Sequence, residues 1–180
     1  MSSLPLIPYP QEIVPSSDCF ALTPDVCIIS DAPNRGNAKF LKNRLSTATG
    51  YPFNLKQDFI SPGIYLKLRD APVELESESY NLLVAADSIK IEAPTPHGVF
   101  NGIQTLLQLL PPEIESSVSH PETEWVIPGM LISDQPRFSW RGFMLDEGRH
   151  FHGKETVLNL LDVMASLMLG IILSMIFERS

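Results

Sequence analysis

The sequence contains little cysteine and few basic residues, and each shortage excludes a class of protein. Two cysteines among 180 residues exclude a disulfide-rich secreted scaffold. Cys19 and Cys27 permit one disulfide, but two free thiols in a reducing compartment are favoured. Thirteen Lys and Arg against 21 Asp and Glu give a formal net charge of −8. We therefore expect no nucleic acid partner, because the chain offers no basic patch to neutralise phosphates.

The sequence also lacks the long apolar runs of signal peptides and membrane spans. Residues 1–14 contain neither a basic segment nor a long apolar run, so we expect no signal peptide and favour the cytoplasm. The apolar run from Val163 to Phe177 is shorter than the roughly 20 residues that span a bilayer. It is interpreted as the end of a buried helix followed by a strand, and no membrane partner is expected.

Hydrophobic patterning predicts an α+β domain over residues 1–124. We expect one mixed or antiparallel sheet with helices on one face. Gly98 and Gly102 lower the helix propensity of their segment, which favours close packing against the sheet over ligand binding. The predicted elements are edge structure at 7–22, strands at 26–30, 63–68, 78–85 and 88–92, with a hairpin at Ala86-Asp87, and helices at 37–47 and 97–110.

A second part, residues 125–180, follows a linker at 111–124. Residues 138–145 form a short apolar run that predicts a strand buried on both faces. From Lys154 to Leu169 the apolar residues recur every three or four positions, which indicates an amphipathic helix. This order predicts a β-then-α unit.

A motif at the start of this unit resembles the beginning of the catalytic barrel of β-N-acetylhexosaminidases, glycoside hydrolase family 20. The resemblance extends upstream through Ile7-Pro8, residues 78–82 and residues 98–110, so it covers about residues 4 to 170. The nine motif positions that match at fixed spacing are Pro136, Arg137, Phe138, Arg141, Gly142, Asp146, Arg149, His150 and Phe151.

The resemblance implies hydrolysis of terminal N-acetylglucosamine or N-acetylgalactosamine from glycans, without a cofactor. In the family the 2-acetamido oxygen of the substrate attacks its own anomeric carbon, a Glu is the general acid, and the preceding Asp orients the acetamido group. That Asp-Glu pair lies beyond the second barrel strand and is absent here, so no catalytic residue is assigned. Glu147 beside Asp146 imitates the pair but lies on the first strand.

Arg141 is the residue whose family role transfers directly. It matches the Arg that hydrogen-bonds the 3- and 4-hydroxyls of the terminal sugar, a task that suits the planar guanidinium. The alternative is a structural ion pair, for example with Asp146. The resemblance implies supporting roles for Asp146, Arg149 and His150. A metal cluster of His150, His152 and Glu155 is disfavoured, and no metal is expected.

After Gly170 the sequence departs from the family, which there has a strand ending in His and Asp residues. Residues 171–180 lack these side chains. A closed barrel takes roughly 250 residues, so only the first strand and helix of an incomplete (β/α)₈ barrel are expected. A truncated gene, a shifted reading frame or one part of a split gene would explain this, and the missing remainder would then be a partner. The alternative is a non-catalytic interaction or glycan-binding module.

Overall fold

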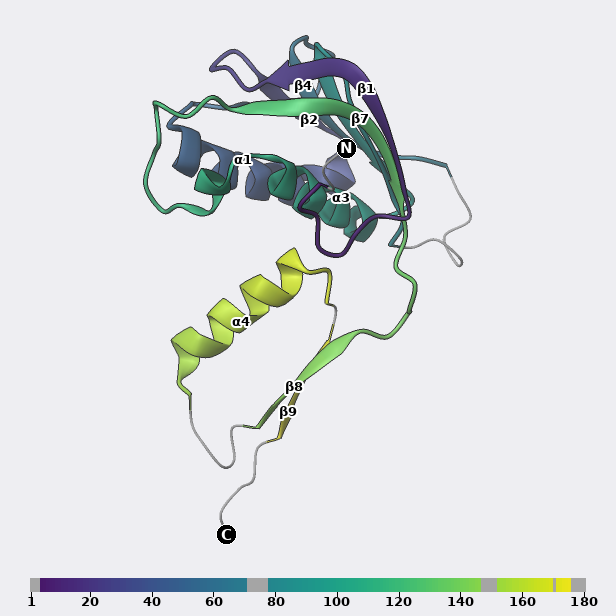
Figure 1. The fold of residues 1–180 in the computed structure, drawn as a ribbon, viewed down its shortest axis with the longest axis vertical. Coiled ribbons are helices and arrows are strands. Elements are labelled where there is room, and N and C mark those ends of the chain that lie inside the picture. Colours follow the sequence, from purple (N-terminus) through teal and green to yellow (C-terminus); the bar gives the residue numbers. More distant parts are fainter. Residues whose placement is uncertain (1–3, 71–77, 147–151, 170, 176–180) are drawn as a thin grey trace. The chain divides into compact units, whose positions relative to one another are not determined.

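The computed structural model describes residues 4–70, 78–146, 152–169 and 171–175. The chain divides into two compact units, Met1–Gln135 and Pro136–Ser180 (Figure 1). Each unit has its own sheet and is described by itself.

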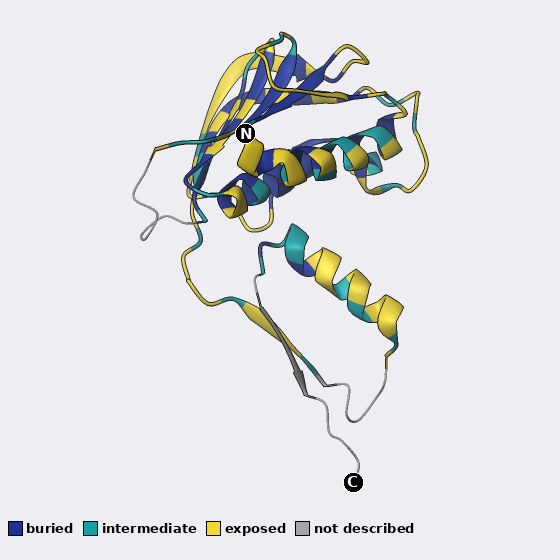
Figure 2. Ribbon diagram, turned by 180° about the vertical axis from the view of Figure 1, so that it is seen from behind, coloured by how far each residue is buried: buried dark blue, intermediate teal, exposed yellow. Residues whose placement is uncertain are grey.

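The first unit is a seven-stranded mixed sheet with two long helices, α1 and α3, on one face (Figures 1 and 2). The strand order is β1-β7-β5-β6-β4-β2-β3, in which β3, β2, β4 and β6 are parallel and β5, β7 and β1 pair antiparallel. The predicted α+β class with one sheet is thereby confirmed. The elements in chain order are β1 Glu12–Ala21, β2 Cys27–Ser30, α1 Arg35–Thr49, β3 Asn54–Lys56, β4 Gly63–Leu68, β5 Tyr80–Val84, β6 Ser88–Ala93, α3 Pro96–Leu109 and β7 Val126–Asp134, with 3-10 turns η1 Ala32–Asn34 and η2 Pro112–Glu115.

Local sequence explains where the two helices begin and end. Gly50 adopts a left-handed conformation, φ 75°, and caps the end of α1, as predicted. Thr95 caps the start of α3, since its side-chain oxygen accepts a hydrogen bond from the Gly98 N–H at 3.2 Å. Leu110 is already extended, and Pro111 prevents α3 from continuing.

Gly98 and Gly102 hold α3 against the sheet, as predicted. A Cβ added at Gly98 would overlap the carbonyl oxygen of Ser79 and lie 2.8 Å from the Ala93 Cβ. A Cβ at Gly102 would lie 2.5 Å from the Ile91 Cγ2 and 3.1 Å from the Tyr80 ring. The two glycines therefore set the distance between α3 and strands β5 and β6.

The division between the units differs from the predicted boundary at residue 124. Strand β7 lies between β1 and β5 in the first sheet, with Leu131 opposite both Val14 and Leu83. It therefore completes the first unit instead of leading into the second. The predicted linker at 111–124 also contributes to the first unit, because Ile114 is buried and the His120 N–H donates to the Ala48 carbonyl at 2.8 Å.

A chain ending at Gln135 should fold by itself, and a chain ending at Met130 should be much less stable. The shorter chain loses Ile132, which is fully buried, together with the pairs that residues 131–134 of β7 make with β1 and β5. Burial of one such side chain is worth about 1.5–3 kcal/mol, so the lost residues should lower the unfolding free energy by roughly 3 kcal/mol or more. Urea unfolding of both chains measures the difference. Equal urea midpoints of the two chains would show that residues 131–134 of β7 do not contribute to stability.

The second unit contains β8 Gly142–Asp146, α4 Lys154–Ser166 and β9 Ile171–Met175, and β8 pairs in parallel with β9. The predicted strand and helix are both present. The expectation that residues 138–145 are buried on both faces is wrong for Phe138, Trp140, Phe143 and Met144, which are all exposed. Among the described residues β8 has β9 as its one strand neighbour, which leaves these side chains uncovered.

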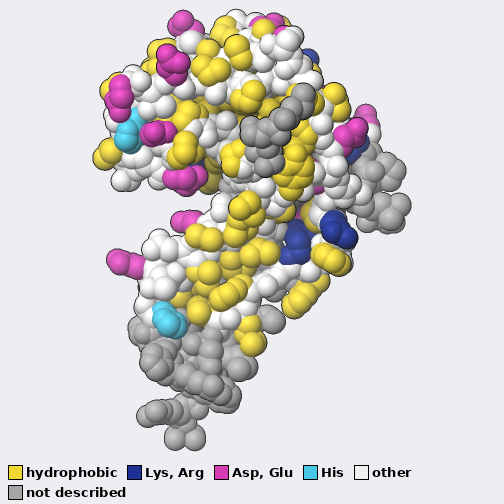
Figure 3. All heavy atoms as spheres, in the orientation of Figure 1, with side chains coloured by type: hydrophobic (Ala, Val, Ile, Leu, Met, Phe, Trp, Pro, Cys, Tyr) yellow, Lys and Arg dark blue, Asp and Glu magenta, His cyan; other side chains and the backbone are white. Residues whose placement is uncertain are grey.

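Helix α4 buries only part of the predicted apolar stripe. Met164 and Met168 are buried, whereas Leu161 is exposed. Leu158 and Val163 are exposed as well, and apolar side chains gather over α4 in Figure 3. In the described part of the chain, no helix has the length and apolar character needed to cross a membrane.

Candidate functional site

Arg141 lies immediately before β8, and its guanidinium joins the start of this strand to the end of α4. Its Nε donates to the Met168 carbonyl oxygen at 2.9 Å, and its Nη1 donates to the Phe138 carbonyl oxygen. Met168 lies just after the last turn of α4 and has a backbone φ of 57°. Its carbonyl oxygen accepts the bond from Arg141. These guanidinium bonds have a structural function, and they go to backbone carbonyls and not to the carboxylate partner that sequence analysis offered as the structural alternative.

The other predicted site residues fall at or beyond the end of β8. Asp146 is the last residue of the strand, and its side chain lies outside what the structure describes. Arg149 and His150 are outside the described residues altogether. Their supporting roles, and the ion pair between Arg141 and Asp146, therefore stay predictions.

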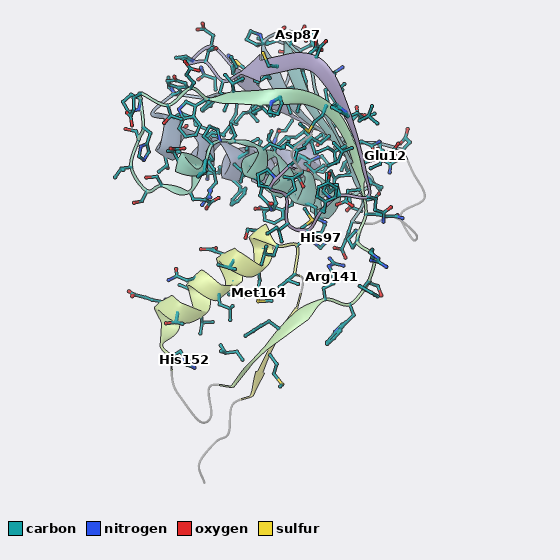
Figure 4. All side chains as sticks on the ribbon, in the orientation of Figure 1. Glu12, Asp87, His97, Arg141, His152 and Met164 are labelled. Carbon is teal, nitrogen blue, oxygen red and sulfur yellow. The ribbon has the colours of Figure 1, made fainter. Side chains whose placement is uncertain are left out.

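His152 and Glu155 are described and exposed. In Figure 4 His152 lies at the opposite end of the second unit from Arg141. Within the described ranges, no group of three or more His, Cys, Asp and Glu side chains is placed to hold a metal ion. Both cysteines are free thiols, with Cys19 exposed and Cys27 buried.

A buried polar cluster that sequence analysis missed lies in the first unit, where β5 begins and β7 ends. The Tyr80 hydroxyl donates to the Asp134 Oδ2 at 3.2 Å and lies 2.6 Å from the Thr105 Oγ1. The Asp134 Oδ1 also accepts from the Gln11 N–H at 3.1 Å. The cluster therefore ties β5, α3, β7 and the start of β1 together. No local motif signals it, because its members come from four separate segments.

Burial controls the protonation of this cluster. Desolvation raises the pKa of the Tyr80 hydroxyl well above its usual range, and the nearby Asp134 carboxylate adds to the shift. Desolvation also raises the pKa of Asp134, although the hydrogen bonds from Gln11 and Tyr80 oppose the change. Tyr80 therefore remains a hydrogen-bond donor at neutral pH. Beside the cluster is a polar recess of about 240 Å³, bordered by Glu12, Arg69 and Ser79.

The raised pKa of Asp134 predicts a pH-dependent stability. The folded state binds this proton more tightly than the unfolded chain, so the contribution is present below the ordinary pKa near 4 and is lost as pH rises through the folded pKa. Asp134→Asn has no such proton and keeps an acceptor for Gln11. The variant should thus gain stability relative to the wild type as pH rises above about 4, as measured by urea unfolding. A relative gain toward acid pH instead would contradict the assignment.

These two units define a class: an α+β domain followed by a parallel β-α-β segment that begins with the Pro136–Phe151 motif. Residues 3–135 match "Glycosyl hydrolase family 20, domain 2", and residues 138–171 match "Glycosyl hydrolase family 20, catalytic domain". The chain therefore belongs to glycosyl hydrolase family 20.

Particular relatives agree with this family. A beta-hexosaminidase of Porphyromonas gingivalis is 35% identical over 165 residues, which is 89% of this chain and 21% of that protein. The Streptomyces plicatus N-acetyl-beta-hexosaminidase in complex with Thio-NAglucal has a TM-score of 0.85 at 32% identity, covering 94% of this chain and 34% of that one. The GH20 enzyme of Streptomyces coelicolor gives the same TM-score at 31% identity. The chain thus spans about a fifth to a third of these relatives.

Proposed function

We propose that this chain is part of a β-N-acetylhexosaminidase that removes terminal N-acetylglucosamine or N-acetylgalactosamine from glycans. The observation that carries the proposal is the succession of two family 20 matches, domain 2 and then the catalytic domain, in one chain. Relatives named as β-hexosaminidases match along nearly the whole chain, which supports the same activity. The reaction would be substrate-assisted, with the acetamido oxygen as nucleophile.

The second unit is proposed to be the first β-α segment of a (β/α)₈ barrel. Barrel strands are parallel and buried between inner side chains and an outer ring of helices. β8 and β9 are parallel, with α4 between them in the chain, as such a segment requires. The exposed Phe143 and Met144 on β8 and the exposed Leu158 and Leu161 on α4 form apolar surfaces that further strands and helices would cover.

Arg141 is proposed to contact the 3- and 4-hydroxyls of the terminal sugar. It lies at the start of β8, whereas barrel enzymes build their sites at the carboxyl ends of strands. A long side chain is needed to reach substrate from there. Its contacts to Phe138 and Met168 use Nη1 and Nε, so the fork itself is fixed in orientation by the fold. Asp146, Arg149 and His150 are proposed to support neighbouring loops.

The competing function is a non-catalytic interaction or glycan-binding module formed by the first unit. That unit has its own core, and it presents Phe59, which is 73% exposed and stacks on the Tyr65 ring at 5.2 Å between centroids. An exposed aromatic face is a common contact for sugar rings. The first unit would then bind a glycan without any barrel.

The 180 residues alone should release no chromophore from an aryl N-acetyl-β-glucosaminide. General acid catalysis alone contributes about 10²–10⁴-fold, and the acetamido-orienting Asp is missing as well. A fusion of this chain to the remaining barrel of the Streptomyces plicatus enzyme should hydrolyse the same substrate. The measurement is absorbance of the released phenol.

Two outcomes would contradict the proposal. Turnover by the purified chain that disappears with Arg141→Ala would show that these residues contain a complete site. A folded fusion that binds chitooligosaccharides but never hydrolyses them would favour the binding module. A Phe59→Ala control in the fusion separates the two functions, because only the binding module requires this ring.

A further inference from the structure

A second candidate site lies in the first unit, between the start of α1 and the carboxyl ends of the parallel strands β2 and β3. It is a pocket of about 530 Å³. Strand β2, helix α1 and strand β3 follow one another in the chain, and β2 pairs in parallel with β3. In open sheets of this connectivity, ligands bind outside the carboxyl ends of the strands. The residues that line the pocket are Ser30, Arg35, Ala38, Lys39, Leu55, Lys56 and Gln57.

The charges that border this pocket are all positive. Arg35 and Lys39 are one turn apart on α1, and Lys56 ends β3. None of the three forms an ion pair with a described residue, and the described residues that line the pocket include no Asp or Glu. In a chain of net charge −8, three unpaired cations around one cavity form a local field of opposite sign.

The carboxylate of Asp31, the residue after Ser30, is engaged in hydrogen bonds. Asp31 Oδ1 accepts from the Asn34 N–H at 3.2 Å and from the Asn34 Nδ2 at 2.8 Å. Its Oδ2 accepts from the Leu68 N–H at 2.8 Å. These three bonds hold the carboxylate toward η1 and β4, and it forms no ion pair with Arg35 or Lys39.

The Ser30 side chain adds a neutral hydrogen-bonding group to the pocket. Ser30 is only 9% exposed and lines the pocket, yet no described group hydrogen-bonds its hydroxyl. Strand alternation places Ser30 on the same face as Ile28, toward α1, because Cys27 and Ile29 pack with Tyr65 on the other face. The hydroxyl oxygen is not among the fully buried polar atoms that lack a partner, so it is accessible from the pocket and a ligand oxygen there can hydrogen-bond it.

The other walls of the pocket indicate what the ligand carries besides its charge. Ala38 is buried and Leu55 is 43% exposed, so one side of the cavity is apolar. The Gln57 amide adds a neutral polar group. We propose that this pocket binds a small phosphate monoester, whose dianionic phosphate lies against Arg35, Lys39 and Ser30 and whose organic group contacts Leu55. The N-terminal end of α1 adds a favourable dipole for the anion.

Titration of the full chain with phenyl phosphate, followed by ³¹P NMR at constant ionic strength, tests the proposal. Saturable binding is expected, several-fold tighter than that of inorganic phosphate, because only the ester reaches the apolar wall. Arg35→Gln with Lys39→Gln should weaken binding by about tenfold or more for each lost contact. Ser30→Ala should weaken it less, since a neutral hydrogen bond is lost.

The matched control is the pair Lys42→Gln and Lys90→Gln, which removes the same charge from α1 and β6 outside the pocket. It should leave the affinity unchanged. Non-saturable binding, or an equal loss in the control pair, would overturn the site because the effect would follow net charge alone. Equal affinity for phenyl phosphate and inorganic phosphate would overturn the monoester assignment. None of these results depends on glycosidase activity.

Discussion

Arg141→Lys, in a complete family 20 enzyme that carries this segment, should lower kcat/KM by roughly 10- to 150-fold. A lysine ammonium cannot bridge two adjacent hydroxyls as the guanidinium does, and a charge-assisted hydrogen bond is worth about 1.5–3 kcal/mol. Arg149→Lys, at a motif position for which we propose only a supporting role, is the control and should cost far less. The measurement is steady-state hydrolysis of aryl N-acetyl-β-glucosaminides.

The structure adds a second consequence of this substitution. Lysine has no Nε donor for the Met168 carbonyl, so the link between β8 and α4 is lost as well. Substrates that lack the 3- or 4-hydroxyl separate the two effects, because loss of the sugar contact should shrink on deoxy sugars whereas structural loosening should not. The same factor on parent and deoxy sugars would show that Arg141 acts only through the fold.

Gly98→Ala should destabilise the first unit strongly, whereas Gly36→Ala should not. The new methyl at Gly98 meets the Ser79 backbone and the Ala93 Cβ, and overpacking of this kind costs about 1–3 kcal/mol or more. The methyl at Gly36 meets nothing within 4 Å, so the better helix propensity of alanine should stabilise α1 by a few tenths to about 1 kcal/mol.

Urea unfolding of the chain ending at Gln135 measures both changes. The pair is well matched, because each substitution adds one methyl to a helical glycine with ordinary φ. If Gly98→Ala lowers the unfolding free energy by no more than Gly36→Ala changes it, α3 can move away from β5 and β6 at little cost.

Local signals predicted most of the first unit. The predicted helices at 37–47 and 97–110 are α1 and α3, and the predicted strand at 63–68 has the same bounds as β4. Each of the two helices has its own apolar periodicity and its own stop signal, Gly50 after α1 and Pro111 after α3. The predicted hairpin is β5 and β6, with Val84 opposite Ile89.

The errors arose where distant residues decide the structure. β3 was missed, because its three residues carry too short a pattern. The residues of β7 were assigned to the second part, whereas they complete the first sheet, since their partners on β1 lie far away in the chain. The cluster of Tyr80, Thr105 and Asp134 was missed for the same reason, because its members lie far apart in the chain. For Arg141, the motif predicted a substrate contact, but the hydrogen bond to Met168 depends on how α4 ends.

The place of β7 in the sheet also fixes the order in which a growing chain can fold. β1 is made early, but among the described residues its one strand neighbour is β7, and the Gln11 N–H donates to Asp134, 123 positions later. During synthesis β1 therefore remains unpaired until nearly all of the first unit has emerged from the ribosome. Strands β2 to β6 and both helices can assemble meanwhile through shorter connections. We expect β1 to dock last, so a chaperone that holds extended segments would find it exposed for longer than any other strand of this unit.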